Sequence, residues 1–188
     1  SNIDKFSITL PSKSLKEVEK FLSSCDISQP INFFIDKGQV VFISADEIIT
    51  IRALDGSYPN YSQLIPEAFS KTLKFDRKEL ISSLERIAVL ADQHNNVIKM
   101  TADNDSNIVK ITTEAQDIGS GSESLPVVMN SESFQIAFNV RYLLEGIKVI
   151  DTNNVQLSCN SATTPAVFSP VDTNFNFTYL VMPIQIRN

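Results

Sequence analysis

The chain has 188 residues, of which 43% are hydrophobic and 20% are charged, a composition that excludes an intrinsically disordered chain. No apolar run approaches the roughly 20 residues that a helix needs to span a bilayer, so a transmembrane helix is excluded. The formal net charge is −6 and the isoelectric point is about 4.8, which argues against a simple basic nucleic-acid-binding domain.

One structural unit is expected to occur three times along the chain. Short alternating stretches end at Leu10, Phe75 and Phe138, and a residue that starts a helix follows at once, at Pro11, Asp76 and Asn139. Two places further on is a cation (Lys13, Lys78, Arg141), and two more on is a leucine (Leu15, Leu80, Leu143). The copies lie 65 and 63 residues apart, and repetition at a nearly fixed period indicates one unit used again.

Each unit is predicted to be a strand, an amphipathic helix and a meander of antiparallel strands, which makes the fold class α+β. The helices should bury Leu15, Val18 and Leu22 in the first copy, Leu80, Leu84, Ile87 and Val89 in the second, and Leu143, Ile147 and Ile150 in the third. The strands after the helices are expected at 31–35, 39–44 and 47–52, then at 97–101, 108–112 and 125–128, and last at 155–158, 166–168 and 179–182.

The three copies divide unevenly. Residues 71–188 hold two complete units, whereas residues 1–66 hold one unit without a partner. The segment 58–66 contains two prolines, Pro59 and Pro66, and is predicted to be the boundary.

Catalytic and metal-binding patterns are weak. The one histidine, His94, lies in a polar stretch that is typical of a surface loop, and 119–122 is expected to be a flexible glycine-containing turn. Asp103, Asp105, Asn107 and Glu114 match four positions of a calcium-loop template, but its required glycine is replaced by Ile108, so a β-hairpin is expected. No metal or cofactor is predicted. Cys25 and Cys159 suit a reducing cytoplasm, with a single disulfide as the alternative.

Two surface features each have two interpretations. The repeated cations are either an ordinary solvated helix face or a wall that meets phosphates without reading bases. The apolar carboxy-terminal stretch 179–186 is either a buried last strand or the wall of a groove for a peptide.

Three segments resemble one known family. Residues 52–61 with 64–66, residues 138–144 and residues 179–183 look like the interdomain segment, the last helix and the carboxy terminus of the bacterial DNA polymerase III beta subunit, the sliding clamp. The resemblance implies a DNA-clamp fold with antiparallel sheets outside and helices on the inner face. It also implies that residues 1–66 are the second half of the middle domain, that 67–188 are the complete third domain, and that the chain is a fragment.

The implied function is a cytoplasmic processivity factor and not an enzyme. The family's homodimeric ring encircles duplex DNA, slides on it without sequence preference and tethers a polymerase. Tethering raises the effective concentration of the polymerase. By this resemblance the DNA-facing candidates are Lys13, Arg77, Lys78, Arg141 and Lys148. The implied partners are the polymerase III alpha subunit, the clamp loader and repair polymerases, each bound through a short peptide.

The resemblance also implies the residues of the peptide-binding groove. They are Pro59, Gln63, Leu64, Asn139, Tyr142, Pro165, Leu180, Met182, Pro183 and Ile184. Gln63 stands where the family often has a basic residue, and the tail continues past the family's usual end with Arg187 and Asn188. Part of the groove belongs to residues outside this chain, so weak peptide binding is expected.

The implied ring contact involves Val89, Leu90, Glu114, Asp117 and Glu123. Alternatively, Val89 and Leu90 are the buried end of their helix. Without a first domain the chain cannot close a ring, so it is expected to be mainly monomeric. The alternative function is a small β-rich enzyme or ligand-binding protein with a pocket near Tyr142 and Met182.

Overall fold

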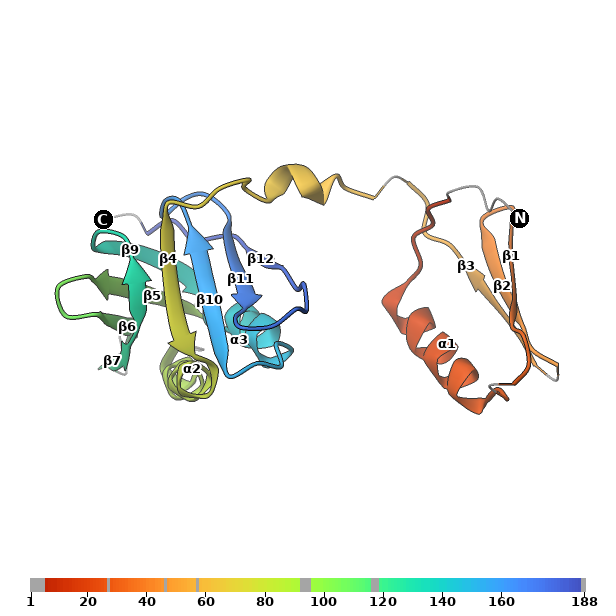
Figure 1. Ribbon diagram of the computed structural model, residues 1–188, viewed down its shortest axis with the longest axis horizontal. Helices are drawn as coiled ribbons and strands as arrows, with labels where there is room; N and C mark the ends of the chain where they lie inside the picture. The colour runs from red at the N-terminus through yellow and green to blue at the C-terminus, as the bar shows by residue number, and fades with distance from the viewer. Residues whose placement is uncertain are drawn as a thin grey trace. The chain divides into compact units, whose positions relative to one another are not determined.

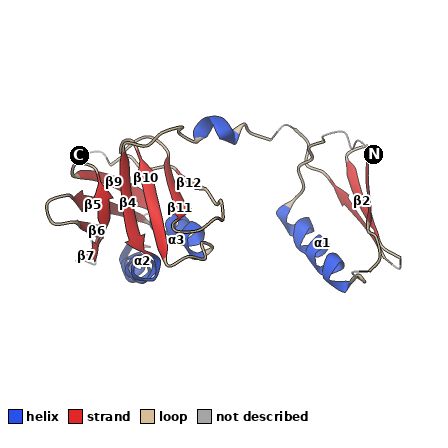
Figure 2. Ribbon diagram, viewed as in Figure 1, coloured by secondary structure: helices blue, strands red, loops and turns tan. Residues whose placement is uncertain are grey.

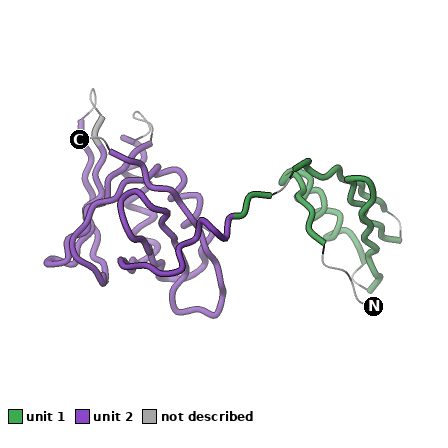
Figure 3. Tube along the Cα trace, turned by 90° about the horizontal axis from the view of Figure 1, so that it is seen from above, with its two compact units in different colours: residues 1–60 green, residues 61–188 purple. Residues whose placement is uncertain are grey.

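The computed structural model describes residues 6–26, 28–45, 47–56, 58–91, 96–115 and 119–186. Contacts divide the chain into two compact units, unit 1 (Ser1–Asn60) and unit 2 (Tyr61–Asn188), coloured separately in Figure 3. The expected domain boundary at residue 66 stays a prediction. Within the described ranges, no helix has the length and apolarity needed to cross a membrane.

Unit 1 is a helix on a three-stranded antiparallel sheet. Its elements are α1 (Ser12–Ser24), β1 (Asn32–Asp36), β2 (Gln39–Ile43) and β3 (Ile48–Arg52), and the strands lie in the order β1-β2-β3. Lys37 and Gly38 have φ values of 45° and 75°, the left-handed conformation that a two-residue hairpin requires. Val18 and Phe21 of α1 are buried, as are Val40 and Ile51 of the sheet.

Two predictions for unit 1 are wrong for the same reason. Residues 6–10 form no strand, although they alternate like one. Leu15 and Leu22 were expected in the core, yet both are about half exposed. A strand exists only when another strand satisfies its backbone, and a helix buries a leucine only where another layer covers it. The described part of unit 1 supplies neither partner.

Unit 2 begins with a short helix, η1 (Tyr61–Leu64), followed by two of the predicted repeats (Figure 1). The first repeat and its extension contain β4 (Lys71–Asp76), α2 (Arg77–Ala91), β5 (Val97–Asp103), β6 (Ile108–Ala115), β7 (Gly119–Pro126) and β8 (Val128–Asn130). The second contains β9 (Phe134–Asn139), α3 (Val140–Lys148), β10 (Asn154–Cys159), β11 (Ala166–Pro170) and β12 (Tyr179–Val181). The order of helices and antiparallel strands agrees with the sequence prediction except between residues 119 and 130. The single short strand expected at 125–128 is wrong, because β7 ends at Pro126 and β8 begins at Val128.

The two repeats of unit 2 are joined by reciprocal strand pairing. One sheet has the order β12-β11-β10-β4-β8 and the other has the order β7-β6-β5-β9. The first strand of one repeat, β4, therefore pairs with β10 of the other, and the first strand of the other, β9, pairs with β5. Helices α2 and α3 pack against one another, and Figure 2 shows them in blue along the same side of the strands.

Local chemistry explains where the helices begin. Asn139 caps α3, because its side-chain oxygen accepts hydrogen bonds from the backbone N–H groups of Arg141 and Tyr142. Asp76 does the same for α2 by accepting from the N–H of Glu79 at 2.9 Å. The predicted hairpin at the calcium-like sequence is confirmed, with Asp103 paired to Ile108.

The turn predicted at 119–122 is wrong. These residues form the start of β7, and Gly121 pairs with Thr113 of β6. A Cβ atom at Gly121 would come within 2.7 Å of Leu90 Cδ1. The glycine therefore lets a strand pass close under the end of α2, rather than making a flexible turn.

Leu84→Ala should destabilise unit 2 by about 2–5 kcal/mol, because this side chain is fully buried and its truncation leaves a cavity. Val89→Ala lies on the same helix but at a position that is 73% exposed, so it should change the free energy of unfolding by less than about 0.5 kcal/mol. Urea unfolding followed by circular dichroism measures both. Equal effects of the two substitutions would contradict the assignment of the core.

Candidate functional site

Five of the predicted groove residues meet at one hollow of unit 2. A pocket of about 400 Å³ is lined by Asn139, Tyr142, Tyr179, Leu180, Val181, Met182 and Ile184. Asn139, Tyr142, Leu180, Met182 and Ile184 were predicted from the sequence, and Tyr179 and Val181 were not. We call this pocket the tail hollow, because five of its seven residues belong to the carboxy-terminal stretch.

Strand pairing and helix capping bring these residues together. Asn139 ends β9 and caps α3, so that Tyr142 projects from the first turn of the helix and is about half exposed. The tail arrives through β12, which pairs with β11. Beyond β12 the N–H of Ile184 donates a hydrogen bond of 2.8 Å to the carbonyl oxygen of Ala137. The tail is therefore held against the outer edge of β9.

Tyr179 lines the tail hollow and contacts helix α3. Its hydroxyl donates a hydrogen bond of 2.9 Å to the carbonyl oxygen of Tyr142. Burial raises the pKa of the Tyr179 phenol, and the charges of Glu145 and Tyr142 raise it further. The ring lies against Gly146 of α3, and a Cβ atom there would overlap it. The sequence signal for this contact was a glycine inside a helix, where glycine is unfavourable unless packing requires it.

The chemistry of the tail hollow is that of a binding surface. Its walls are mainly aliphatic and aromatic, and no carboxylate, imidazole, thiol or amine is among its seven lining residues. Met182 is 55% exposed, and methionine adapts its shape to different apolar ligands. The side chains of Asn139 and Tyr142 supply polar groups. This arrangement suits an apolar side chain of a peptide or ligand.

The other predicted groove residues do not line the tail hollow. Gln63 and Leu64 are exposed on η1, while Pro165 and Pro183 are half-buried next to β11 and within the tail. Pro59 is exposed and belongs to unit 1. Their participation in a groove stays a prediction.

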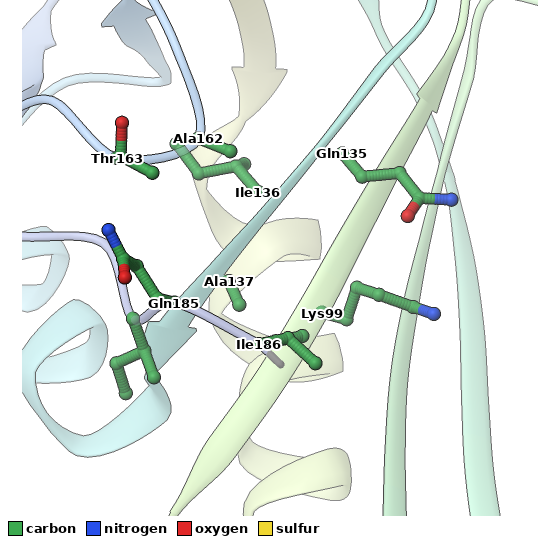
Figure 4. A pocket seen from close by; sticks show the side chains of 9 residues that line it. Lys99, Gln135, Ile136, Ala137, Ala162, Thr163, Gln185 and Ile186 are labelled. Atoms are coloured by element: carbon green, nitrogen blue, oxygen red, sulfur yellow. The ribbon is translucent and has the colours of Figure 1, made fainter. Parts of the chain in front are cut away.

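A second hollow of about 460 Å³ lies along the same tail, and Ile184 lines both pockets. Figure 4 shows Gln185 and Ile186 of the tail with Ala162 and Thr163 on one side and with Lys99 and Gln135 on the other. This pocket was not predicted from the sequence, and of its lining residues only Ile184 was named as a groove residue.

The predicted DNA-facing cations have different environments. Lys13, Lys78 and Arg141 are exposed on α1, α2 and α3. Arg77 is half-buried and its Nε donates to the carbonyl oxygen of Thr152 at 2.9 Å. Lys148 forms an ion pair of 2.7 Å with Glu85. The helices of unit 2 thus present an exposed basic surface that acidic neighbours partly neutralise.

The residues predicted for the ring contact also differ from one another. Val89 is 73% exposed, so the alternative that it is the buried end of its helix is wrong, while Leu90 is half-buried against β7. Glu123 accepts two hydrogen bonds from Arg86, and this arginine holds the pKa of the carboxyl below its usual range. Glu114 lies on β6. Asp117 lies outside the described residues.

The remaining residues that could serve catalysis or metal binding are His94, the two cysteines and the acidic side chains. Among the residues that the structure describes, no three His, Cys, Asp or Glu side chains are placed to hold a metal ion. His94 falls outside the described ranges. The two cysteines are free thiols, which makes the disulfide alternative wrong, and burial raises the pKa of Cys159 to about 11. Such a thiol is protonated at neutral pH and unreactive.

Comparison with known proteins identifies relatives over the whole chain. Residues 62–185 match the sequence profile of the family described as DNA polymerase III beta subunit, C-terminal domain. The beta sliding clamp of Synechococcus elongatus is 46% identical over 98% of this chain and 49% of its own length, and that of Synechocystis sp. is 40% identical over 100% of this chain and 48% of its own.

The comparison with solved structures also finds a DNA polymerase III beta subunit that matches the chain. The DNA polymerase III beta subunit of Thermotoga maritima superposes with a TM-score of 0.87 at 28% identity, over 100% of this chain and 50% of that protein. The chain spans about half the length of the relatives it matches.

Gly146→Ala should force the Tyr179 ring away from α3 and break its hydrogen bond to Tyr142. Overpacking should destabilise unit 2 by about 1–3 kcal/mol, although alanine is the better helix former by about 1 kcal/mol. In a Tyr179→Ala background the same substitution should become neutral or stabilising, because the obstructing ring is gone. Urea unfolding of the four proteins tests this as a double-mutant cycle. Equal effects in both backgrounds would contradict the packing of the ring on the helix.

Proposed function

Because the chain belongs to the DNA polymerase III beta subunit family, the beta sliding clamps, we propose that it supplies the later half of a ring that encircles duplex DNA. In this proposal residues 1–66 are the second half of a middle domain and residues 67–188 are a complete third domain. The complete protein acts as a homodimeric processivity factor. It keeps a polymerase near its template by topology and by high effective concentration, so it needs no tight bond to DNA.

The tail hollow carries the proposal that partners dock through short peptides. Asn139 and Tyr142 come from one segment, and Leu180, Met182 and Ile184 come from another that is about 40 positions later in the chain. Both segments contribute to one apolar depression with polar groups among its walls. We propose that an apolar side chain of a glutamine-containing linear peptide enters it. The natural partners would be the polymerase III alpha subunit, the clamp loader and repair polymerases.

The helical surface supports a loose contact with DNA. Lys78 and Arg141 are exposed on helices that pack side by side. Long cations on a mixed-charge surface attract phosphates without fixing a base register. Such weak attraction allows sliding. The net charge of −6 limits the non-specific adhesion of nucleic acid to the rest of the protein surface.

The edge of the four-stranded sheet supports the ring contact. β7 is the outer strand of that sheet, and Val89 is exposed at the end of the neighbouring α2. An open strand edge beside an apolar side chain suits pairing with another subunit. Glu123 is already paired with Arg86, so its charge is partly neutralised before such a contact forms.

We assign no catalytic role to the chain. The alternative of an enzyme or small-ligand site near Tyr142 and Met182 receives no support from the lining of the tail hollow, in which no carboxylate, imidazole, thiol or amine stands beside the two tyrosines. The free thiols Cys25 and Cys159 suit a reducing compartment, so we place the protein in the cytoplasm.

A labelled glutamine-plus-hydrophobic peptide should bind the 188-residue chain saturably, with a dissociation constant in the high micromolar range. Met182→Ala and Tyr142→Ala should each weaken binding about tenfold or more, because each removes a wall of the tail hollow. Fluorescence anisotropy gives the dissociation constants.

Val128→Ala is the matched control for the peptide titration. Val128 is also an exposed apolar residue of unit 2, but it lies on β8 outside the tail hollow, so its substitution should leave binding unchanged. Binding that survives both site substitutions, or that the control abolishes equally, would reject the tail hollow as the peptide site.

Replacing Lys78 and Arg141 together by alanine should weaken the binding of the chain to duplex DNA at low salt. The slope of log affinity against log salt should become shallower by roughly 1 for each phosphate that the variant no longer neutralises. Lys110→Ala removes a cation from the strand β6 and serves as the control, with an unchanged slope. A larger change of slope for Lys110→Ala than for the helix variant would place the DNA contact on the sheets.

A further inference from the structure

The second hollow lies where the tail separates from the edge strand β9. Within the described ranges, one backbone hydrogen bond joins the tail to β9, from the N–H of Ile184 to the carbonyl oxygen of Ala137. Beyond it, residues 184–186 of the tail and residues 135–137 of β9 line the two sides of the hollow. Every lining residue belongs to unit 2, so the walls of this hollow come from one compact unit.

The backbone at this edge of β9 suits an extended peptide. β9 is the end strand of its sheet, and along an edge strand the backbone groups of every second residue point away from the neighbouring strand. The carbonyl of Ala137 points outward to the tail, so the N–H and carbonyl of Gln135, two places earlier, point outward as well. Among the described residues, no backbone group pairs with them. An unpaired donor and acceptor at a strand edge bind a polypeptide in extended form.

The charge of the second hollow is positive. Lys99 is the one charged residue among the nine that line it, and Figure 4 shows its side chain beside that of Gln135. Lys99 is half-buried, and it forms no ion pair with another residue that the structure describes. Its neighbours in the two ladders, Thr112 and Ala137, are uncharged. A carboxylate is therefore the complementary group.

The second hollow continues the tail hollow. Ile184 lines both, so a peptide with a side chain in the tail hollow reaches the second hollow by passing over Ile184. An extended chain advances about 3.3 Å per residue, so about three residues lead from one pocket of this size to the next. Ile186 is 49% exposed and supplies an apolar wall at the far side.

We propose that the second hollow receives the flank of the peptide that docks in the tail hollow, and that Lys99 selects an acidic residue in this flank. The acidic residue lies about three positions from the apolar anchor. The inference rests on the proposed function, because the anchor must occupy the tail hollow. It adds a preference for charge, which the tail hollow cannot supply because none of its seven lining residues is charged.

Four labelled peptides with the same glutamine-plus-hydrophobic core test the preference on the 188-residue chain. Two carry a pair of glutamates about three residues from the anchor, one on the amino side and one on the carboxyl side. The other two carry glutamines at the same places. In about 0.15 M salt, where distant charges are screened, one acidic peptide should bind about three- to fivefold more tightly than its glutamine counterpart. This is the upper end of the range for ion pairs near a surface. Fluorescence anisotropy gives the dissociation constants.

Lys99→Met removes the charge and keeps the length of the side chain. It should abolish the preference for the acidic peptide and change the affinity for the glutamine peptides by less than about twofold, since the tail hollow is untouched. Lys110→Met is the matched control. Lys110 is an exposed lysine on the same face of the sheet, opposite Thr101, but it does not line the second hollow. Its substitution should leave the preference intact.

A cross-linking experiment locates the flank without changing Lys99. The acidic peptide that binds better would carry a cysteine in place of one glutamate, and it would be mixed with a Gln135→Cys chain under mild oxidation. A mixed disulfide should form, and excess peptide without cysteine should suppress it. A Lys110→Cys chain should give only background. Mass spectrometry of the digested product separates the expected disulfide from adducts of the half-buried Cys25.

The inference is overturned if the acidic and glutamine peptides bind the unmodified chain equally. A preference that survives Lys99→Met, or a disulfide that forms at residue 110 as readily as at residue 135, would overturn it by placing the flank elsewhere. In each case the proposed peptide site stands if the glutamine peptides bind and Met182→Ala weakens them. If none of the four peptides binds, the peptide site itself is rejected, together with the inference that rests on it.

Discussion

Strand exchange between repeats is the constraint on which the rest of the structure depends. A single strand–helix–strand unit leaves one backbone edge and part of one helix face without partners. In unit 2, the pairing of β4 with β10 and of β9 with β5 satisfies both edges and encloses Leu80 and Leu143 completely. Buried backbone groups must be hydrogen-bonded, so neither repeat of unit 2 is complete alone.

The tail hollow is a product of the same pairing. β10 and β11 carry β12, which delivers the tail to the outer edge of β9, next to the cap of α3. Gly146 then determines how closely the Tyr179 ring approaches the helix. The site therefore rests on strands, a capped helix turn and a packed aromatic ring. Rigid supports of this kind keep a binding surface preformed and limit the entropic cost of binding.

Local features could be predicted from the sequence, and features that need a distant partner could not. Alternation located most strands, and the residues before the helices located their starts. Segment 6–10 and Leu15 were misassigned because the sequence pattern describes a repeat in a complete domain. The strand at 119–122 was missed because Gly121 is explained by its close approach to Leu90, more than 25 positions away. Family resemblance supplied five residues of the tail hollow, but the contact between Tyr179 and Gly146 appears only in three dimensions.

The reciprocal pairing also has a consequence for how the chain folds. β4 meets β10 only after the hairpins, two helices and several loops between them have been synthesised and brought into register. The entropic cost of closing such a long loop is incurred before the new ladder contributes any stability. Folds dominated by contacts between distant positions acquire their structure slowly. The hairpins of unit 2 should thus form early, and the union of the two sheets should be the slow step, during which open strand edges are exposed to other chains.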